Sequence, residues 1–337
     1  MNKPLAVRLI FFALTFPVIF LAGCKKNDTS PKPVITITPP AQQNKIVYLD
    51  YLIGPNTYTL WTANYDGSGA QQVNIAMPAK VKLGGGLPKI SLDDKNIYFN
   101  GISTVDNVSS IYSCDMTGNN VKLLVAGGNN GQAEIKGTYY TNQQGKILYG
   151  MVVNYAQYLW TANSDGSDQQ QINVTLPVNS YVPSYSMLVP SLDGKTIFFI
   201  IYLADGNEFI YSCGVDGSKL TPVINDPSGY SYIIGAAFST GQQSKIVYMN
   251  YKGSGQMMIA NSDGSGAQAV NYTLPYPAAT DVNPPAISPD GKTIFFNTTG
   301  LNGNEYGVYS CNIDGSNLKQ LLTPSTQYHA FFIGQAF

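Results

Sequence analysis

A four-residue turn motif that recurs six times constrains the fold of this chain more than any other feature. Its third residue is always Gly, followed by Ser or Asn, and the six glycines are 51, 48, 51, 47 and 51 residues apart. The copies are Tyr65–Ser68, Met116–Asn119, Ser164–Ser167, Val215–Ser218, Ser262–Ser265 and Ile313–Ser316. Repeats of this length that contain several short strands are typical of propeller blades. We therefore predict an all-β fold, a single six-bladed β-propeller with four-stranded blades, over residues 42–337.

The copies fall into two alternating types. Odd copies open with Lys-Ile-(Val/Leu)-Tyr at Lys45, Lys146 and Lys245, whereas even copies carry Ser-x-Asp-(Asp/Gly)-Lys from Ser91, Ser191 and Ser288. Short β-branched and aromatic runs separated by Gly, Asp, Asn or Pro predict the strands of a meander. Asp-Gly between two such runs favours a tight hairpin, because Gly tolerates a positive φ. In the fourth blade, strands are expected near 186–191, 195–202, 207–215 and 219–224.

The two ends of the repeat region are predicted to share one blade. The first copy begins at Lys45 with the second strand of a blade and lacks the innermost strand. The chain ends in Ile333–Phe337, which matches the innermost strand of the fifth copy, Ile234–Phe238. We expect the C-terminal strand to pair into the first blade and close the ring, which removes two open sheet edges.

The N-terminus has the pattern of an export signal. Lys3 and Arg8 precede a short apolar stretch that ends in Leu21–Cys24, too short and wrongly flanked for a spanning helix. It resembles the lipobox of bacterial lipoproteins, which implies a signal peptide over 1–23 and acylation of Cys24. Residues 24–41, rich in Pro and Thr, are expected to form an extended tether. Because Lys25 follows the cysteine, we expect an outer-membrane lipoprotein, facing the periplasm or the cell surface.

Charge excludes one class of partner. Charged residues make up only 12% of the chain, the net charge is −1, and the one arginine, Arg8, lies in the export signal. Nucleic-acid binding relies on clustered Lys and Arg, so we expect no nucleic-acid partner.

Several apparent motifs are better explained by repetition than by chemistry. Cys114, Cys213 and Cys311 occupy equivalent places in the even copies, where the odd copies have alanine, and are expected to be small buried side chains. The turn motifs offer too few oxygen ligands for calcium. Glu208 and Glu305 lie in matching loops and are expected to be solvated loop charges. We predict no metal site, cofactor or catalytic residue, including His329, the only histidine.

Tyrosine provides the strongest binding signal. Tyrosines are numerous in the connections between blades, which are expected to lie on one rim of the ring beside His329. Tyrosine buries a broad area at little entropic cost and keeps a polar tip, so it is favoured in recognition surfaces. The alternative is packing between blades. The candidate rim consists of Tyr181, Tyr185, Tyr230, Tyr232, Tyr276, Tyr328 and His329.

The Ser-x-Asp-Gly-Lys runs and Asp-Gly-Ser turns resemble the TolB-like six-bladed β-propeller family over residues 42–337. The resemblance implies the fold. TolB itself carries an extra N-terminal domain, so its binding to the Pal lipoprotein is only a third hypothesis here. We predict a monomeric, lipid-anchored, non-enzymatic module that binds an envelope protein or glycan. The alternative is a hydrolase or lyase resembling propeller lactonases, which acidic or His side chains converging on the central axis would favour.

Overall fold

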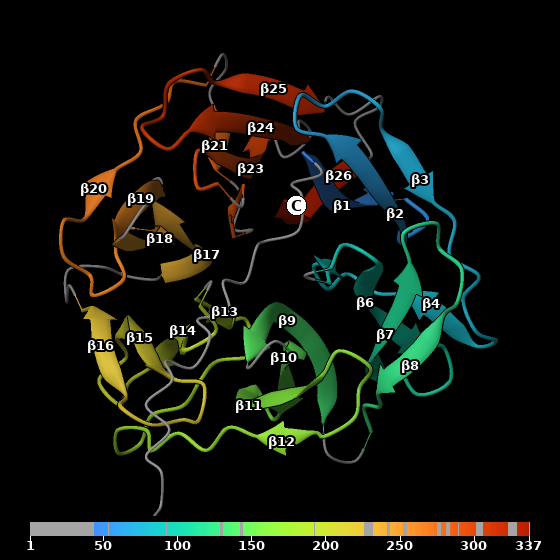
Figure 1. Ribbon diagram of the computed structural model, residues 1–337, viewed down its shortest axis with the longest axis horizontal. Helices are drawn as coiled ribbons and strands as arrows, with labels where there is room; N and C mark the ends of the chain where they lie inside the picture. Colours follow the sequence, from blue (N-terminus) through green and yellow to red (C-terminus); the bar gives the residue numbers. More distant parts are fainter. Residues whose placement is uncertain are drawn as a thin grey trace, which may run out of the picture. The chain divides into compact units, whose positions relative to one another are not determined.

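The computed structural model describes residues 44–336 except for short gaps. The gaps are residues 53, 92, 129–130, 142–143, 192, 226–231, 241–242, 252–254, 275–277, 281–283, 289, 301–305 and 323–328. The described residues form six small antiparallel sheets around a common centre, which confirms the six-bladed propeller (Figure 1). No helix in the described part is long and apolar enough to cross a membrane.

The odd blades each contain four strands with a long innermost strand. From the inside outward, blade 1 consists of β26 (His329–Ala336), β1 (Lys45–Leu52), β2 (Thr57–Asn64) and β3 (Gln71–Val73). Blade 3 consists of β9 (Gln132–Thr141), β10 (Gln144–Val153), β11 (Ala156–Asn163) and β12 (Gln170–Gln171). Blade 5 consists of β17 (Tyr232–Thr240), β18 (Gln243–Asn250), β19 (Gln256–Asn261) and β20 (Gln268–Ala269).

In the even blades the innermost strand is short, and in blades 2 and 6 it is split into two pieces. Blade 2 consists of β4 (Val81–Leu83), β5 (Lys89–Ile90), β6 (Asn96–Ser103), β7 (Ser109–Asp115) and β8 (Lys122–Val125). Blade 4 consists of β13 (Val189–Pro190), β14 (Thr196–Tyr202), β15 (Glu208–Gly214) and β16 (Thr221–Ile224). Blade 6 consists of β21 (Ala278–Thr280), β22 (Ala286–Ile287), β23 (Thr293–Gly300), β24 (Tyr306–Asn312) and β25 (Lys319–Leu322). Pro88, Pro190 and Pro285 stand in or beside these short strands and cannot donate to a ladder.

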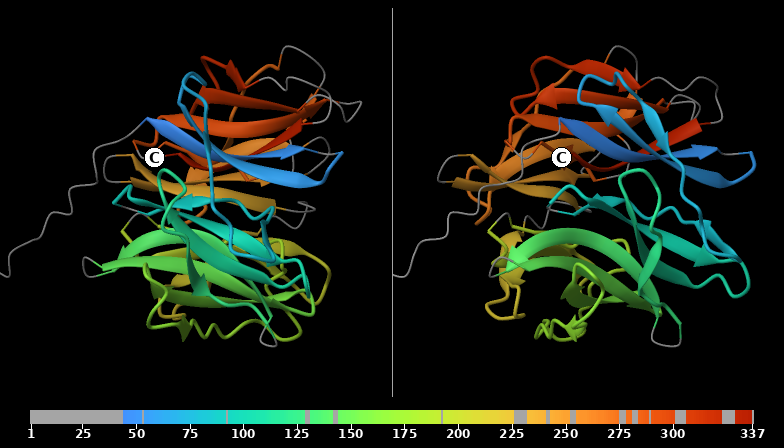
Figure 2. Two further views of the ribbon diagram at one scale, coloured as in Figure 1. Left: turned by 90° about the vertical axis from the view of Figure 1, so that its right-hand side faces the viewer. Right: turned by 45° about the vertical axis from the view of Figure 1, so that its right-hand side comes forward.

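The predicted ring closure is confirmed. β26, from the end of the chain, pairs antiparallel with β1, from Ile46 opposite Ala336 to Leu52 opposite His329 (Figures 1 and 2). Ile333 of β26 is buried between blades 1 and 6. The ring is thus closed by hydrogen bonds between segments almost three hundred residues apart in sequence.

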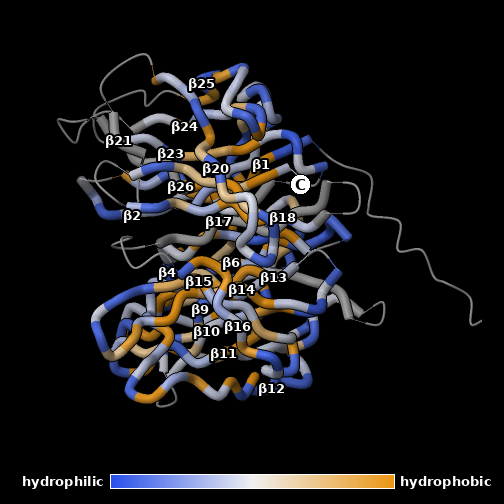
Figure 3. Tube along the Cα trace, turned by 90° about the vertical axis from the view of Figure 1, so that its left-hand side faces the viewer, coloured by the Kyte–Doolittle hydropathy of each residue, from blue (hydrophilic) through white to orange (hydrophobic). Residues whose placement is uncertain are grey.

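The core lies between the blades. Each central strand packs on both faces, so successive residues serve different junctions: Ile197 and Phe199 of β14 pack toward blade 3, while Phe198 packs toward blade 5. This explains why the central strands are continuous apolar runs. Hydrophobic colour follows these strands, and hydrophilic colour gathers at the turns (Figure 3).

The three cysteines are small buried side chains, as predicted. Each lies opposite an isoleucine of the neighbouring strand, Cys114 opposite Ile97 for example, where odd blades pair isoleucine with alanine. All three are free thiols. Burial, with a smaller contribution from a nearby aspartate, raises the pKa of each thiol to about 12.

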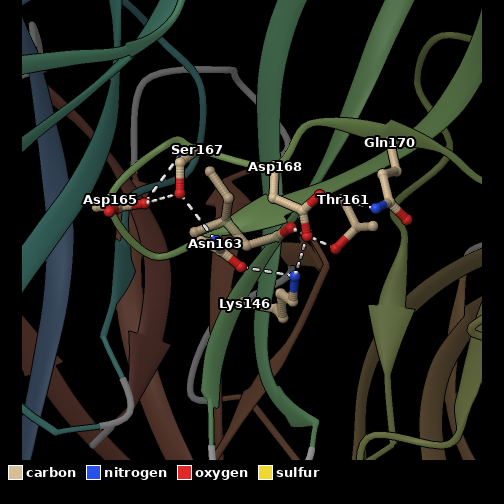
Figure 4. A network of polar contacts seen from close by, with 8 residues as sticks. Lys146, Thr161, Asn163, Asp165, Ser167, Asp168 and Gln170 are labelled. Carbon is tan, nitrogen blue, oxygen red and sulfur yellow. Dashed lines mark hydrogen bonds and ion pairs between the residues drawn. The ribbon is translucent and has the colours of Figure 1, made fainter.

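The turn motif makes its own hydrogen bonds. In the copy at Ser164–Ser167, the Asp165 carboxylate accepts from the Ser167 amide at 3.0 Å and from the Ser167 hydroxyl at 2.6 Å (Figure 4). Lys146 donates to Asn163 and forms an ion pair with Asp168 at 3.1 Å. The hydrogen bonds from Ser167 lower the pKa of Asp165. The carboxylate therefore stabilises its own turn.

Glycine is required in this motif for two reasons. Gly264, like the other five motif glycines, has φ near +85°. A Cβ on Gly264 would lie 1.8 Å from the carbonyl oxygen of Val223 in the preceding blade. The turn therefore also serves as a contact between blades. We call the edge of the ring that carries these turns the turn rim, and the opposite edge, with the hairpins between second and third strands, the loop rim.

Candidate functional site

The connection between β12 and β13, residues 172–188, carries two of the predicted rim tyrosines. Tyr181 is 38% exposed and Tyr185 is 51% exposed. Neither side chain is therefore buried by packing between blades. Together with Tyr155 and Tyr202 of the neighbouring hairpins they form what we call the tyrosine patch.

Backbone hydrogen bonds hold this connection against blade 4. Tyr181 and Tyr202 exchange amide-to-carbonyl bonds of 3.1 and 2.9 Å. Their rings lie 5.2 Å apart between centroids. The backbone positions that carry the two rings are therefore held next to each other by hydrogen bonds.

The same connection is also fixed to blade 3. The Ser184 amide donates to the Tyr155 carbonyl at 3.0 Å, and the Gln157 amide donates to the Val182 carbonyl at 2.7 Å. The buried Gln157 side chain adds a bond to the Ser186 carbonyl at 3.1 Å. A loop fixed on both sides loses little conformational entropy when it binds a partner.

Tyr155 is the most exposed member of the patch, at 84%. It stands at the apex of the β10–β11 hairpin with φ of +67°, after Asn154 at +49°. Two left-handed residues suit a two-residue hairpin, but the positions normally take Asn or Gly, and a bulky residue there is strained. Such strain is found most often at functional sites. Tyr155 was not predicted, because it lies in a hairpin within a blade and the predicted rim residues lie in connections between blades. The aromatic residue directly after Asn in a tight hairpin is the sequence signal that indicates it.

Glu208 differs from expectation. We expected a solvated loop charge, but Glu208 is the first residue of β15 and only 7% exposed. Its carboxylate accepts a hydrogen bond from the Tyr185 hydroxyl. Burial, followed by the bond to Glu208 and its negative charge, raises the pKa of Tyr185 well above its usual value. The prediction was wrong because the connection 172–188 brings Tyr185 against Glu208. The repeat pattern does not encode the path of this connection.

The other predicted rim residues are only partly covered by the structure. Tyr232 begins β17 opposite Asn250, and His329 begins β26 opposite Leu52, so both backbones lie at the loop rim. Their side chains are not among those described. Outside the described residues lie Cys24, Tyr230, Tyr276, Glu305 and Tyr328.

The inner strands carry a second group of ionisable residues. Lys136 of β9 forms an ion pair with Glu134 at 3.0 Å and donates to the Ser184 carbonyl at 3.4 Å. Lys89 of β5 is 9% exposed and donates to the Gly334 carbonyl of β26 at 2.9 Å. Burial, with a smaller contribution from the charge of Lys136, lowers the pKa of Lys89 to about 8. Among the described residues, no group of three or more His, Cys, Asp or Glu side chains is arranged to hold a metal ion.

Comparison of the sequence with known proteins gives no match. No protein-family model matches the chain, and no curated protein is similar to it in sequence.

The fold, in contrast, is shared with many solved structures. TolB from Acinetobacter baumannii superposes with a TM-score of 0.64 at 15% identity, over 88% of this chain and 68% of that one. A chain of a nidogen/laminin complex gives 0.55 at 15% identity, over 86% and 98%. An oligogalacturonate lyase in complex with manganese gives 0.50 at 12% identity, over 86% and 75%.

These similarities define the class of protein. The chain is a six-bladed β-propeller whose structural neighbours include TolB, as its sequence motifs predicted. At such low identity the likeness concerns the fold alone.

Proposed function

We propose that this protein is a lipid-anchored envelope propeller that binds a protein or glycan partner through the tyrosine patch and performs no catalysis. The observation that carries the proposal is the patch itself: exposed tyrosines on a loop that both neighbouring blades hold in place. Propellers of this fold occur in TolB and in a nidogen/laminin complex, which supports a binding role. Cys24, as a lipidated residue, would place the ring at the outer membrane, in the periplasm or at the surface.

The binding role is tested with paired variants of the full-length protein in its native envelope. Tyr155→Ser combined with Tyr181→Ser removes two patch rings without touching the Tyr185–Glu208 bond. Tyr158→Ser is the matched control, because Tyr158 is 48% exposed on β11 but is not part of the patch. Chemical cross-linking followed by mass spectrometry should recover a partner with wild type and with the control, and lose it with the double variant. Equal recovery with the double variant would contradict the proposal.

The anchor is tested separately. Cys24→Ala should abolish incorporation of an alkyne-labelled fatty acid and move the protein from the membrane fraction to the soluble fraction. Persistence of the label in the variant would overturn the lipoprotein assignment.

A second candidate, a propeller lyase or hydrolase, is favoured by one observation. The inner strands bring Lys89, Lys136 and Glu134 into the centre of a fold that an oligogalacturonate lyase shares. The test is incubation of the full-length protein with Mn²⁺ and acidic oligosaccharides. Cleavage that Lys89→Met abolishes would establish this enzyme; unchanged substrate would leave the binding role as the function.

A further inference from the structure

A cleft of about 410 Å³ opens at the turn rim between blades 4 and 5. Its walls come from the ends of the blade 4 strands and from the turns of blade 5. Of the eleven described residues that line it, six carry a hydroxyl group and two carry a carboxylate. The volume is within the range of small-molecule sites, but such sites are usually lined mainly by apolar side chains. The lining therefore indicates a polar ligand.

The cleft belongs to only one of three equivalent junctions. Even blades meet odd blades also at blades 2 and 3 and at blades 6 and 1. Ser212 of β15 corresponds to Ser113 of β7 and Ser310 of β24, because each pairs with the third residue of the preceding strand. Ser113 and Ser310 are buried, at 6% and 5% exposure, whereas Ser212 is partly exposed. The junction of blades 4 and 5 is therefore open where the other two are closed.

The outermost strand of blade 4 explains this difference. Ser212 lies opposite Thr221 of β16. The two equivalent serines instead lie opposite lysines, Lys122 and Lys319. Side chains directly opposite each other on neighbouring strands contact each other, and a lysine stem can cover a serine, for which threonine is too short. Val223 also stands where the other two junctions have leucine, so shorter side chains leave the cleft open.

The walls of the cleft offer hydroxyl groups that have no partner in the protein. Within the described part of the chain, four side-chain hydroxyls of the lining make no hydrogen bond, those of Thr196, Ser212, Ser244 and Ser262. A hydroxyl group both donates and accepts, so these groups can bond to the hydroxyl groups of a ligand. An apolar ligand would leave them unpaired, which costs binding free energy.

The charges of the lining favour a neutral ligand. Asp193 forms an ion pair with Lys195 at 3.7 Å, which offsets its charge. One oxygen of Asp263 accepts hydrogen bonds from the Ser265 amide and hydroxyl at 2.9 and 2.7 Å, and its other oxygen has no partner among the described residues. Carboxylates repel anionic ligands and accept strong hydrogen bonds from O–H groups. One uncompensated carboxylate beside several free hydroxyls therefore suits a neutral ligand rich in hydroxyl groups.

We propose that the cleft between blades 4 and 5 binds a neutral sugar or polyol, either free or as one residue of a longer glycan. The hydroxyl groups of the ligand donate to the Asp263 carboxylate and exchange hydrogen bonds with the free hydroxyls of the walls. The cleft lies on the turn rim and the tyrosine patch on the loop rim, so this site is separate from the binding function proposed above.

The test measures binding to the full-length protein by saturation-transfer NMR and titration, in a detergent without a sugar head group. The probes are sorbitol and the methyl α-glycosides of D-glucose, D-galactose and D-mannose. At least one of them should bind at a single site, whereas tetrahydropyran, the sugar ring without its hydroxyl groups, should not bind. The α-linked disaccharide of the sugar that binds best distinguishes the sources. Tighter binding than the methyl glycoside assigns the cleft to a glycan, and equal or weaker binding assigns it to a free sugar or polyol.

Variants show whether the probes bind in the cleft. Thr196→Val combined with Ser212→Ala should weaken binding at least about tenfold without lowering the melting temperature, because neither hydroxyl has a partner in the protein. Thr221→Lys supplies the residue that blades 2 and 6 have at this position and should also weaken binding. Ser310→Ala is the matched control, because it removes the equivalent hydroxyl from a closed junction, and it should leave binding unchanged.

The proposal is overturned if no sugar or polyol probe binds, or if the variant with Thr196→Val and Ser212→Ala binds like wild type. It is also overturned if tetrahydropyran or cyclohexylamine binds as tightly as the sugars, since the hydroxyl groups would then not be recognised. Loss of sugar binding in the variant with Tyr155→Ser and Tyr181→Ser would place the sugar at the tyrosine patch. That result would overturn the cleft as the site while supporting the binding role of the patch.

Discussion

Tyr181 and Tyr185 lie on one connection, four residues apart, yet their hydroxyl groups have different surroundings. The Tyr185 hydroxyl donates to the buried Glu208 carboxylate, whereas the Tyr181 ring makes a tilted contact with the ring of Tyr202. A hydrogen bond to a charged group contributes more to stability than one between neutral groups. Tyr185 therefore contributes to stability as well as to the exposed surface, and Tyr181 contributes mainly to the surface.

We expect Tyr185→Phe to lower the free energy of unfolding by about 1–3 kcal/mol, because it removes the hydroxyl donor from a buried carboxylate. Tyr181→Phe, the matched control, should change it by less than about 0.5 kcal/mol. Urea denaturation followed by fluorescence measures both. Equal effects of the two variants would show that the bond to Glu208 contributes nothing particular.

Lys89 should make stability depend on pH. Its pKa is lowered to about 8 in the folded protein from 10.5. Between these two values the unfolded state binds one more proton than the folded state, so stability rises with pH. We expect wild type to gain stability relative to Lys89→Met as the pH increases from about 8 toward 10.5. Thermal melts of both proteins across this range measure the difference, and parallel curves would contradict the burial of a titrating lysine.

At the scale of the element, β26 connects several parts of the ring. It pairs with β1, buries Ile333 between blades 1 and 6, and offers the Gly334 carbonyl to Lys89 of blade 2. A single strand thus contacts three blades. Without it, β1 would be an open sheet edge.

Deletion of residues 329–337 should therefore lower the melting temperature sharply or prevent soluble expression. Deletion of residues 25–41, the predicted tether, should leave the melting temperature unchanged. Limited proteolysis and thermal melts of the two truncated proteins give the comparison. Equal stability would mean that the closing strand is dispensable.

The repeat pattern predicted most of the elements because it depends on local rules. Asp-Gly turns and apolar runs mark the strands, and the match between Ile333–Phe337 and Ile234–Phe238 marks the closure. The short inner strands of the even blades were not foreseen, although proline in or beside each one indicates them. The path of residues 172–188 over Glu208 and beside Tyr155 depends on contacts with two neighbouring blades. Periodicity alone contains no information on such contacts.

At the scale of the whole molecule, the first and last strands of the ring, β1 and β26, lie in one sheet. The fifth copy of the repeat contains a sequence that could join them. Gln42–Tyr48 differs from Gln242–Tyr248 only at Asn44 and Ser244. In the fifth copy, Ser239, Thr240 and Gly241 stand in sequence between the matching Ile234–Phe238 and this segment. A Ser-Thr-Gly linker between Phe337 and Gln42 would therefore reproduce the blade 5 hairpin in blade 1.

Two circular permutants with this linker test what holds the ring together. One opens at Gly118, inside blade 2, so that its new ends still pair through β7 and β8. The other opens between Gly127 and Gly128, so that side-chain packing and side-chain hydrogen bonds between blades 2 and 3 join its new ends without a shared sheet. We expect the first to melt close to wild type and the second to melt at a lower temperature. Identical melts would show that packing alone closes the ring.

The pairing of β26 with β1 also sets an order of events during biogenesis. Residues 45–52 are made long before residues 329–336, so blade 1 stays incomplete until the latter have been synthesised. The ring can close only after that segment has been released. A chain terminated before β26 would leave the exposed edge of β1 to proteases, so ring closure protects only those molecules that contain the closing strand.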